Sequence, residues 1–405
     1  MTNQQFITQH RQDDVRRLAL GTLPEEIDAR WCLQQIEGWQ LASRKLPQWA
    51  ATEGLWFPPR LSLEQCSGQA AARYKCSIVE RLLPTATQRR SMADLTGGFG
   101  VDFSYMAPLV GAARYYEQNA ELCRIAEHNF LLLGLSQANV VCADTSVELA
   151  WHNADHSLLY LDPARRDVGG RKTIAIEDCT PDVVAMQSEL LQSAPVVMIK
   201  LSPMLDIRMA LRRLTNVSEI HIVSVKGECK ELLLVLTARQ APLHIYCVNL
   251  ESHDAPFVSD AAAAWAVQPK FCDEIGAFLY EPGASLLKGG VQDAVAAHHN
   301  LLKLHRDSHL YTSNTLCPDF PGRIFSVEGH CGFSKGELRS LIGDMAQANL
   351  TVRNFPATVA ELRKRLKLRE GGETYLFATT ACGAGRVLIK CRRAAPHKSQ
   401  AESGE

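Results

Sequence analysis

The spacing of apolar side chains divides the chain into two kinds of pattern. Up to about residue 85, apolar residues such as Trp31, Ile36 and Trp39 recur at near-helical spacing, and a second helix is predicted from Ala70 to Leu83. From about residue 90, short apolar runs alternate with longer amphipathic stretches, which is the pattern of parallel strands joined by helices. We therefore predict an α/β protein with a helical N-terminal region.

Seven strands are predicted in the central part of the chain. The first ends at Asp94, and the other six cover residues 113–117, 139–142, 157–161, 195–199, 219–225 and 231–236. Helices are expected at 99–109 and 120–133, and another is expected to begin with Thr180 as N-cap and Pro181 as its first residue. The last two strands leave no room for a crossover helix, so they should pair as an antiparallel hairpin.

The rest of the chain reads as two smaller α/β units. Residues 241–323 are mixed, with a helix expected at 291–304. Residues 324–394 contain two capping-box patterns, Ser334 with Glu337 and Thr358 with Glu361, and strands at 350–355, 374–380 and 386–392. We expect the tail, residues 395–405, to be disordered.

Composition narrows the class of protein. The 405 residues are 46% hydrophobic and 21% charged, which fits a globular protein of two to four domains. No apolar run is long enough for a membrane helix, and no signal peptide is visible. The thirteen cysteines include no C-x-x-C pair, so we expect free thiols in a reducing cytoplasm and no metal site. A net charge of −1 means that any nucleic-acid binding must use a local basic patch.

A glycine-rich stretch, residues 93–102, lies between the first predicted strand and the next helix. Gly98 and Gly100 can adopt backbone angles that let a ligand approach the main chain, as in nucleotide-binding sheets. The dinucleotide fingerprint would place Phe103 where a small residue is needed, and the stretch has no lysine for a P-loop. An acid followed by a glycine pair resembles motif I of the class I S-adenosylmethionine (SAM) methyltransferases. That resemblance implies cofactor contacts from Asp94, Thr96, Gly97, Gly98, Gly100 and Asp102.

Glu117 ends the second predicted strand, 19 residues after Gly98. An acid at this spacing can accept hydrogen bonds from both ribose hydroxyls of a nucleoside. We expect the next residue, Gln118, to contact the cofactor as well. By resemblance to the fold, Asp144 would contact the adenine amino group, and Asp94 would hold the methionine amino group of SAM.

The sequence Asp162-Pro163-Ala164-Arg165 ends the fourth predicted strand, where the substrate is expected. A carboxylate there can orient an amine toward a methyl group. Nucleobase nitrogen methyltransferases have D-P-P-Y/F/W or N-P-P-Y/F/W here, so Ala164 and Arg165 depart from that pattern, although arginine can also stack on bases or hold phosphate. Uridine C5 methyltransferases use D-P-P-R but need a cysteine after the fifth strand, where residues 200–203 read Lys-Leu-Ser-Pro. C5 chemistry is therefore disfavoured.

Together, residues 94–102, Glu117, residues 162–165 and residues 200–203 followed by Asp206 are similar to a family of bacterial SAM-dependent methyltransferases. Members of that family carry a ferredoxin-like and then a THUMP-like domain after the catalytic domain. The resemblance implies a class I, Rossmann-like seven-stranded sheet. It also implies the following domains: a helical region (1–85), a methyltransferase domain (86–240), a ferredoxin-like domain (241–323), a THUMP-like domain (324–394) and the tail (395–405).

True THUMP domains bind RNA, chiefly tRNA, so the resemblance implies an RNA substrate. Residues 351–405 contain eleven Lys and Arg against five Glu, a net charge of +6, and the predicted helix at 361–369 is markedly basic. Arg363, Lys364 and Lys367 are the expected RNA contacts. The same charges could equally form a solvated helix face.

The leading hypothesis is a cytoplasmic methyltransferase that acts on a base nitrogen of tRNA or rRNA. Asp162, Pro163 and Arg165 are the predicted catalytic residues, and Asp162 is also a predicted cofactor contact. Further predicted substrate contacts are Arg165, Arg166, Lys200 and Ser202. Two alternatives stay open: a methyltransferase of a protein or small molecule, and a non-catalytic RNA-binding protein with a relic SAM pocket.

Overall fold

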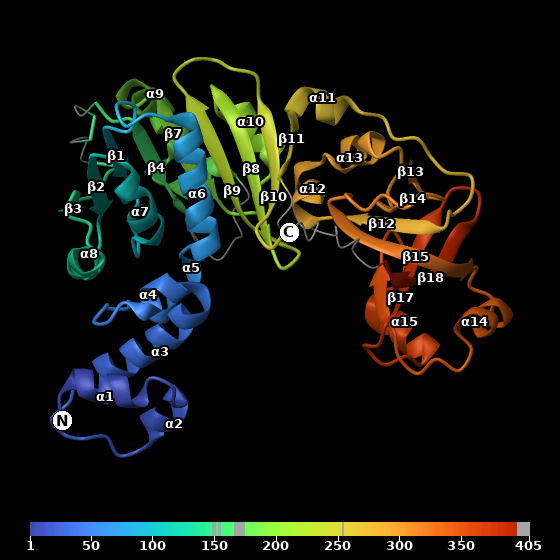
Figure 1. Ribbon diagram of the computed structural model, residues 1–405, viewed down its shortest axis with the longest axis horizontal. Helices are drawn as coiled ribbons and strands as arrows, with labels where there is room; N and C mark the ends of the chain where they lie inside the picture. Colours follow the sequence, from blue (N-terminus) through green and yellow to red (C-terminus); the bar gives the residue numbers. More distant parts are fainter. Residues whose placement is uncertain (148–150, 153–154, 166–174, 253–254, 395–405) are drawn as a thin grey trace, which may run out of the picture. The chain divides into compact units, whose positions relative to one another are not determined.

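The computed structural model describes residues 1–147, 151–152, 155–165, 175–252 and 255–394 (Figure 1). The chain forms two compact units. The first consists of residues 1–221 and 231–242, and the second of residues 222–230 and the chain from 243 onward.

The first unit begins with helices, as the sequence predicts. They are α1 (Asn3–His10), α2 (Val15–Leu20), α3 (Ala29–Lys45), α4 (Pro47–Ala51), α5 (Arg60–Gln65) and α6 (Gln69–Leu82). Asp28 caps α3 by accepting a hydrogen bond from the backbone N–H of Trp31 at 2.9 Å. A Cβ at Gly38 would lie 2.2 Å from that of Phe57, so α3 packs closely on the loop after α4.

A sheet that is mostly parallel in its central part follows the helices. Its strands are β1 (Ser91–Asp94), β2 (Ala112–Glu117), β3 (Ala138–Cys142), β4 (Leu158–Leu161), β7 (Val196–Leu201), β8 (Val217–Val225), β9 (Glu228–Thr237), β10 (His244–Asn249) and β11 (Phe257–Asp260). Within the described residues the strand order is β11-β10-β8-β9-β7-β4-β1-β2-β3. β1, β2, β3, β4 and β7 are parallel, and β9 is antiparallel to β7.

The predicted α/β class is confirmed, with two corrections. The sheet has nine strands in the described part of the chain rather than seven, because β10 and β11 extend it. Thr180 does not cap a helix: it lies in the short strand β6 (Cys179–Thr180), which pairs with β5 (Ala164–Arg165). The N-cap of α9 (Val183–Ser193) is Asp182, whose side chain accepts hydrogen bonds from the N–H groups of Val184 and Ala185. The helix therefore begins after Asp182 and not after Thr180.

The remaining helical segments of the first unit flank the strands. They are α7 (Val101–Met106), η1 (Ala107–Leu109), α8 (Ala120–Leu132), η2 (Ile176–Asp178) and α10 (Ile207–Arg213). Figure 1 shows α6 and α7 side by side. The β8–β9 hairpin turns at Lys226 and Gly227, which both have positive φ, as tight hairpins require.

The second unit contains a sheet of order β13-β14-β12-β15-β18-β17-β16 in the described residues. Its strands are β12 (Phe278–Pro282), β13 (Leu302–Lys303), β14 (Tyr311–Ser313), β15 (Gly322–Cys331), β16 (Asn349–Val352), β17 (Thr374–Ala381) and β18 (Gly385–Arg393). Its helices are α11 (Ala261–Ala266), α12 (Ala284–Gly289), α13 (Gln292–His298), α14 (Lys335–Ile342) and α15 (Val359–Leu366). The helix expected at 291–304 is therefore shorter and gives way to β13.

Both capping boxes of this unit are confirmed. Ser334 with Glu337 opens α14, and Thr358 with Glu361 opens α15. Among the helices that the structure describes, none is long and apolar enough to cross a membrane. The tail, residues 395–405, lies outside the described residues.

Candidate cofactor and acceptor site

The glycine turn lies at the carboxyl end of β1. Gly98 and Gly100 have positive φ values of 61° and 78°. A Cβ at Gly97 would lie 2.3 Å from the Tyr115 ring, and one at Gly100 would lie 2.8 Å from Phe130, so packing forces both to be glycine. A Cβ at Gly98 would meet only a backbone oxygen at 3.7 Å. Gly98 therefore presents its backbone to open space, where a ligand can approach it closely.

Glu117 lies beneath this turn at the end of β2. Its Oε2 accepts a hydrogen bond from the Gly98 N–H at 2.8 Å, and its Oε1 accepts one from the Asn119 N–H at 2.8 Å. Among the residues that the structure describes, each oxygen accepts one hydrogen bond and keeps a lone pair for another, because a carboxylate oxygen can accept two. The side chain is thus fixed in place and can still bind a diol.

The end of β3 adds a second acid to this edge. The Oδ1 atom of Asp144 accepts hydrogen bonds from the hydroxyl and N–H of Ser146, at 2.6 and 2.9 Å, and these lower the pKa of Asp144. Asp144 is half-buried, and Gln118 is exposed. The N–H of Ala143 donates a hydrogen bond to the carbonyl of Glu117 at 3.0 Å, so the ends of β2 and β3 are hydrogen-bonded to each other.

Asp94 closes β1 and is 1% exposed. Its Oδ1 accepts two hydrogen bonds from Thr96, one from the N–H at 3.0 Å and one from the hydroxyl at 3.4 Å. Burial raises the pKa of Asp94 well above its usual value, although the Thr96 N–H acts against this rise. The Thr96 hydroxyl in turn accepts a hydrogen bond from the Asp162 N–H at 2.6 Å, which ties the ends of β1 and β4 together.

The Asp162 carboxylate forms an ion pair with Lys200, from the neighbouring strand β7. Lys200 also lies 3.9 Å from Oδ2 of Asp102. Burial alone would lower the pKa of Lys200, but Asp162 and Asp102 raise it, so the ammonium stays charged. The Asp162 side chain remains 38% exposed, so solvent or an acceptor can reach it.

Other predicted acceptor contacts are less exposed or belong to a turn. Pro163 is buried directly after Asp162. The hydroxyl of Ser202 accepts a hydrogen bond from the N–H of Met204 at 3.3 Å, within the turn that precedes α10. The backbone of Arg165 pairs with Cys179, and Arg166 lies outside the described residues.

The carboxylate of Asp102 points away from open space into a buried network around Lys75, a side chain that is fully buried. The Lys75 Nζ lies 3.0 Å from Oδ1 of Asp102, 2.8 Å from Oε1 of Glu231 and 3.0 Å from the Ser67 hydroxyl. The Tyr160 hydroxyl donates to Oδ2 of Asp102 at 2.7 Å. Sequence reasoning missed this network, although Lys75 lies on the buried stripe of α6.

The predicted RNA contacts on α15 differ in exposure. Lys364 and Lys367 are exposed, and Lys367 lies at the C-cap of the helix with a φ of 54°. The side chain of Arg363 is only 20% exposed and lies 3.5 Å from Glu370. The structure thus leaves two of the three predicted side chains open to solvent.

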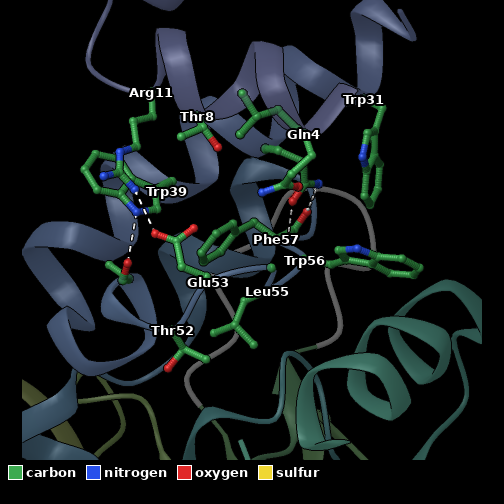
Figure 2. A pocket seen from close by; sticks show the side chains of 14 residues that line it. Gln4, Thr8, Arg11, Trp31, Trp39, Thr52, Glu53, Leu55, Trp56 and Phe57 are labelled. Atoms are coloured by element: carbon green, nitrogen blue, oxygen red, sulfur yellow. Dashed lines mark hydrogen bonds and ion pairs between the residues drawn. The ribbon is translucent and has the colours of Figure 1, made fainter. Parts of the chain in front are cut away.

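A cavity of about 50 Å³ lies among the N-terminal helices (Figure 2). Figure 2 shows Arg11 and Glu53 facing each other, with Nη1 of Arg11 3.4 Å from Oε1 of Glu53. Trp39 donates a hydrogen bond to the Ala50 carbonyl at 3.0 Å. The volume of this cavity suits water-sized molecules and is too small for a nucleoside cofactor. In the described part of the chain, no group of His, Cys, Asp and Glu side chains could hold a metal ion.

Comparison with known proteins places this geometry in a family. Models of a ferredoxin-like domain and of a THUMP domain-like fold match residues 278–321 and 322–393. The chain is similar to the solved structure described as a "putative methyltransferase from Porphyromonas gingivalis W83". Their TM-score is 0.85 at 34% identity, over 97% of this chain and 98% of that chain. No curated protein matched.

Two further solved structures match only part of the chain. A SAM-dependent methyltransferase from Agrobacterium tumefaciens is 15% identical over 42% of this chain and 62% of its own, with a TM-score of 0.30. A structure described as a "putative RNA methyltransferase" from Pyrococcus horikoshii is 16% identical over 43% and 79%, also with a TM-score of 0.30. Scores this low support no argument, whereas the full-length similarity does: the chain belongs to the bacterial class I SAM-dependent methyltransferases with C-terminal ferredoxin-like and THUMP-like domains.

Proposed function

We propose that this protein binds SAM at the glycine turn and methylates a base nitrogen of tRNA or rRNA. The observation that carries the proposal is the open backbone at Gly98, with the fixed Glu117 carboxylate beneath it. SAM, when bound, supplies an electrophilic methyl group on a sulfonium. Gly98 would allow its close approach, and Glu117 would accept hydrogen bonds from its ribose.

Asp94 and Asp144 would bind the two ends of the cofactor. Asp144 uses Oδ1 for Ser146, so its other oxygen can accept from an amino group on adenine. The buried Asp94 has Thr96 as its neutral partner, and an ammonium group would favour its ionised form. Asp102 has partners inside the protein on both oxygens, so we assign it to holding the start of α7 rather than to cofactor contact.

Asp162 would orient the acceptor. Its backbone is held by Thr96 and its carboxylate by Lys200, so it has a defined position. A fixed carboxylate can accept a hydrogen bond from a base amine and direct the nitrogen lone pair toward the methyl group. Arg165, Arg166 and Ser202 stay predicted contacts with the base or its phosphate, whereas Lys200 would act mainly through Asp162.

The RNA acceptor is inferred from the match of residues 322–393 to the THUMP domain-like fold. The exposed Lys364 and Lys367 on α15 are the proposed phosphate contacts there. An RNA acceptor would place the reaction in the cytoplasm.

The test is mass spectrometry of RNA nucleosides from a strain that lacks the gene. We expect one methylated nucleoside to disappear, and to return with the wild-type chain but not with Asp162→Asn. The exposed Asp155→Asn serves as a matched control and should restore it. Unchanged RNA nucleosides, together with SAM turnover on a protein or metabolite, would favour the other kind of methyltransferase. Absence of any SAM turnover would favour the relic pocket.

A further inference from the structure

A buried glutamate in the second unit gathers two arginines from separate segments. Glu281, on β12, is 3% exposed. Its Oε2 accepts a hydrogen bond from Nε of Arg323, on β15, at 2.6 Å, and its Oε1 accepts one from a terminal nitrogen of Arg353 at 2.8 Å. Arg353 follows β16, so the cluster joins residues that lie far apart in the sequence. Both arginine side chains are 42% exposed.

A third arginine lies beside them. Arg393, on β18, is opposite Phe325 in the strand register, and Glu281 is opposite Arg323. The Cζ atoms of Arg323 and Arg393 lie 5.6 and 5.5 Å from the centre of the Phe325 ring. The fully buried ring therefore supports two guanidinium groups at one edge of the apolar core.

The charges of this cluster do not balance. Within the described residues, Arg393 has no carboxylate within 4 Å, whereas its neighbour Arg392 pairs with Glu328. Burial lowers the pKa of Arg393, and repulsion from Arg323 adds to this effect. Three guanidinium groups around one carboxylate leave a net charge of +2, which an anion would compensate.

We propose that Arg323, Arg353 and Arg393 form a phosphate-binding site for the RNA backbone. The inference rests on the proposed RNA acceptor and adds a second contact region to that of α15. Arginine suits this role because its planar guanidinium can donate two parallel hydrogen bonds to one phosphate. Glu281 holds two of the three groups in place, so less side-chain freedom is lost when a phosphate binds.

The experiment measures how the affinity of the full chain for bulk bacterial tRNA depends on salt concentration. In Arg353→Gln/Arg393→Gln, the slope of log K against log salt should fall by roughly 1.4–1.8, since each lost phosphate contact removes about 0.7–0.9. The single variant Arg393→Gln leaves the contacts of Glu281 intact and should lose about half as much. Arg16→Gln/Arg17→Gln removes the same charge from exposed positions on α2 and should keep the wild-type slope.

The outcomes separate this inference from the proposed function. If wild-type protein binds tRNA and both cluster variants keep its slope, the phosphate site is wrong and the RNA acceptor stands. If the control variant loses as much slope as the double variant, the effect is general charge and the site is again wrong. If wild-type protein binds neither bulk tRNA nor rRNA in the same assay, the RNA acceptor and the phosphate site both fail. Melting curves of each variant confirm that the fold is kept.

Discussion

Replacing Lys75 by methionine should strongly destabilise the first unit. The Lys75 ammonium lies between Asp102 and Glu231, whose side chains are only 8% and 5% exposed. Methionine matches the length of the lysine stem but removes the ammonium between the two carboxylates, and Lys200, 3.9 Å from Asp102, is then the nearest cation that stays. Breaking a buried ion pair from one side costs about 3–5 kcal/mol, so we expect a loss of that size near neutral pH.

The pH dependence of this loss has a defined sign. Burial alone would raise the pKa of Asp102, but Lys75 and then Lys200 lower it from 3.8 to about 2. The stability that this carboxylate contributes is therefore present above its unfolded pKa and is lost as the pH falls toward the folded one. In Lys75→Met, repulsion should raise the pKa of one carboxylate, so the variant becomes less stable as the pH rises. The gap between the two proteins should shrink from pH 7 to about pH 4.

Thermal melting followed by circular dichroism provides the assay. A domain of this size loses about 2–4 °C per kcal/mol, so the transition of the first unit should fall by roughly 6–20 °C. In Lys75→Met/Glu231→Gln only Asp102 stays charged, and it keeps the hydroxyls of Ser67 and Tyr160. This double variant should regain most of the loss. A small, pH-independent loss in Lys75→Met, or a double variant less stable than the single one, would refute the reasoning.

Three further predictions concern the site itself. Gly98→Arg should abolish SAM binding by calorimetry while the fold persists, whereas Gly98→Ala, which adds one methyl into open space, should bind measurably better than Gly98→Arg. Asp94→Asn should have a higher melting temperature than wild type at neutral pH. The difference in melting temperature should grow with pH from about 4 upward, because the pKa of Asp94 is raised in the fold and ionising this carboxyl therefore costs stability. The same difference at pH 4 and pH 7 would contradict this prediction. Glu117→Gln should weaken SAM binding by about 1.5–3 kcal/mol, whereas Asp162→Asn should change the SAM affinity only a few-fold and abolish turnover. Similar SAM affinities in these two variants would contradict the separate roles of Glu117 in cofactor binding and of Asp162 in acceptor orientation.

Local signals allowed much of the fold to be predicted from the sequence. Capping boxes at Ser334 and Thr358 involve residues three apart, so they could be identified without tertiary information. Adjacent alternatives were harder to separate: Thr180 and Asp182 both suit an N-cap, and only the paired strand β6 decides between them. The short strands β10 and β11 were missed because each carries little periodic signal of its own.

The site was predictable where strand order alone brings residues together. Asp94 and Glu117 end two parallel strands of one sheet, and Asp162 directly follows a third, so their proximity follows from the topology. The buried network did not follow from it, because Lys75 and Glu231 are 156 residues apart and lie on a helix and a strand. A lysine on the apolar stripe of α6 was the available signal, since a buried lysine needs an anionic partner.

Asp162 connects the cofactor edge to this buried network. Its N–H donates to the Thr96 hydroxyl, whose own partner is Asp94, and its carboxylate pairs with Lys200. Lys200 also lies 3.9 Å from Asp102, the carboxylate to which Lys75 donates a hydrogen bond. Within the described residues, by contrast, the Glu117 carboxylate is fixed by backbone N–H groups, those of Gly98 in the turn after β1 and of Asn119. A change in the buried network should therefore disturb the position of Asp162, and hence the orientation of the acceptor, more than it disturbs the binding of the ribose.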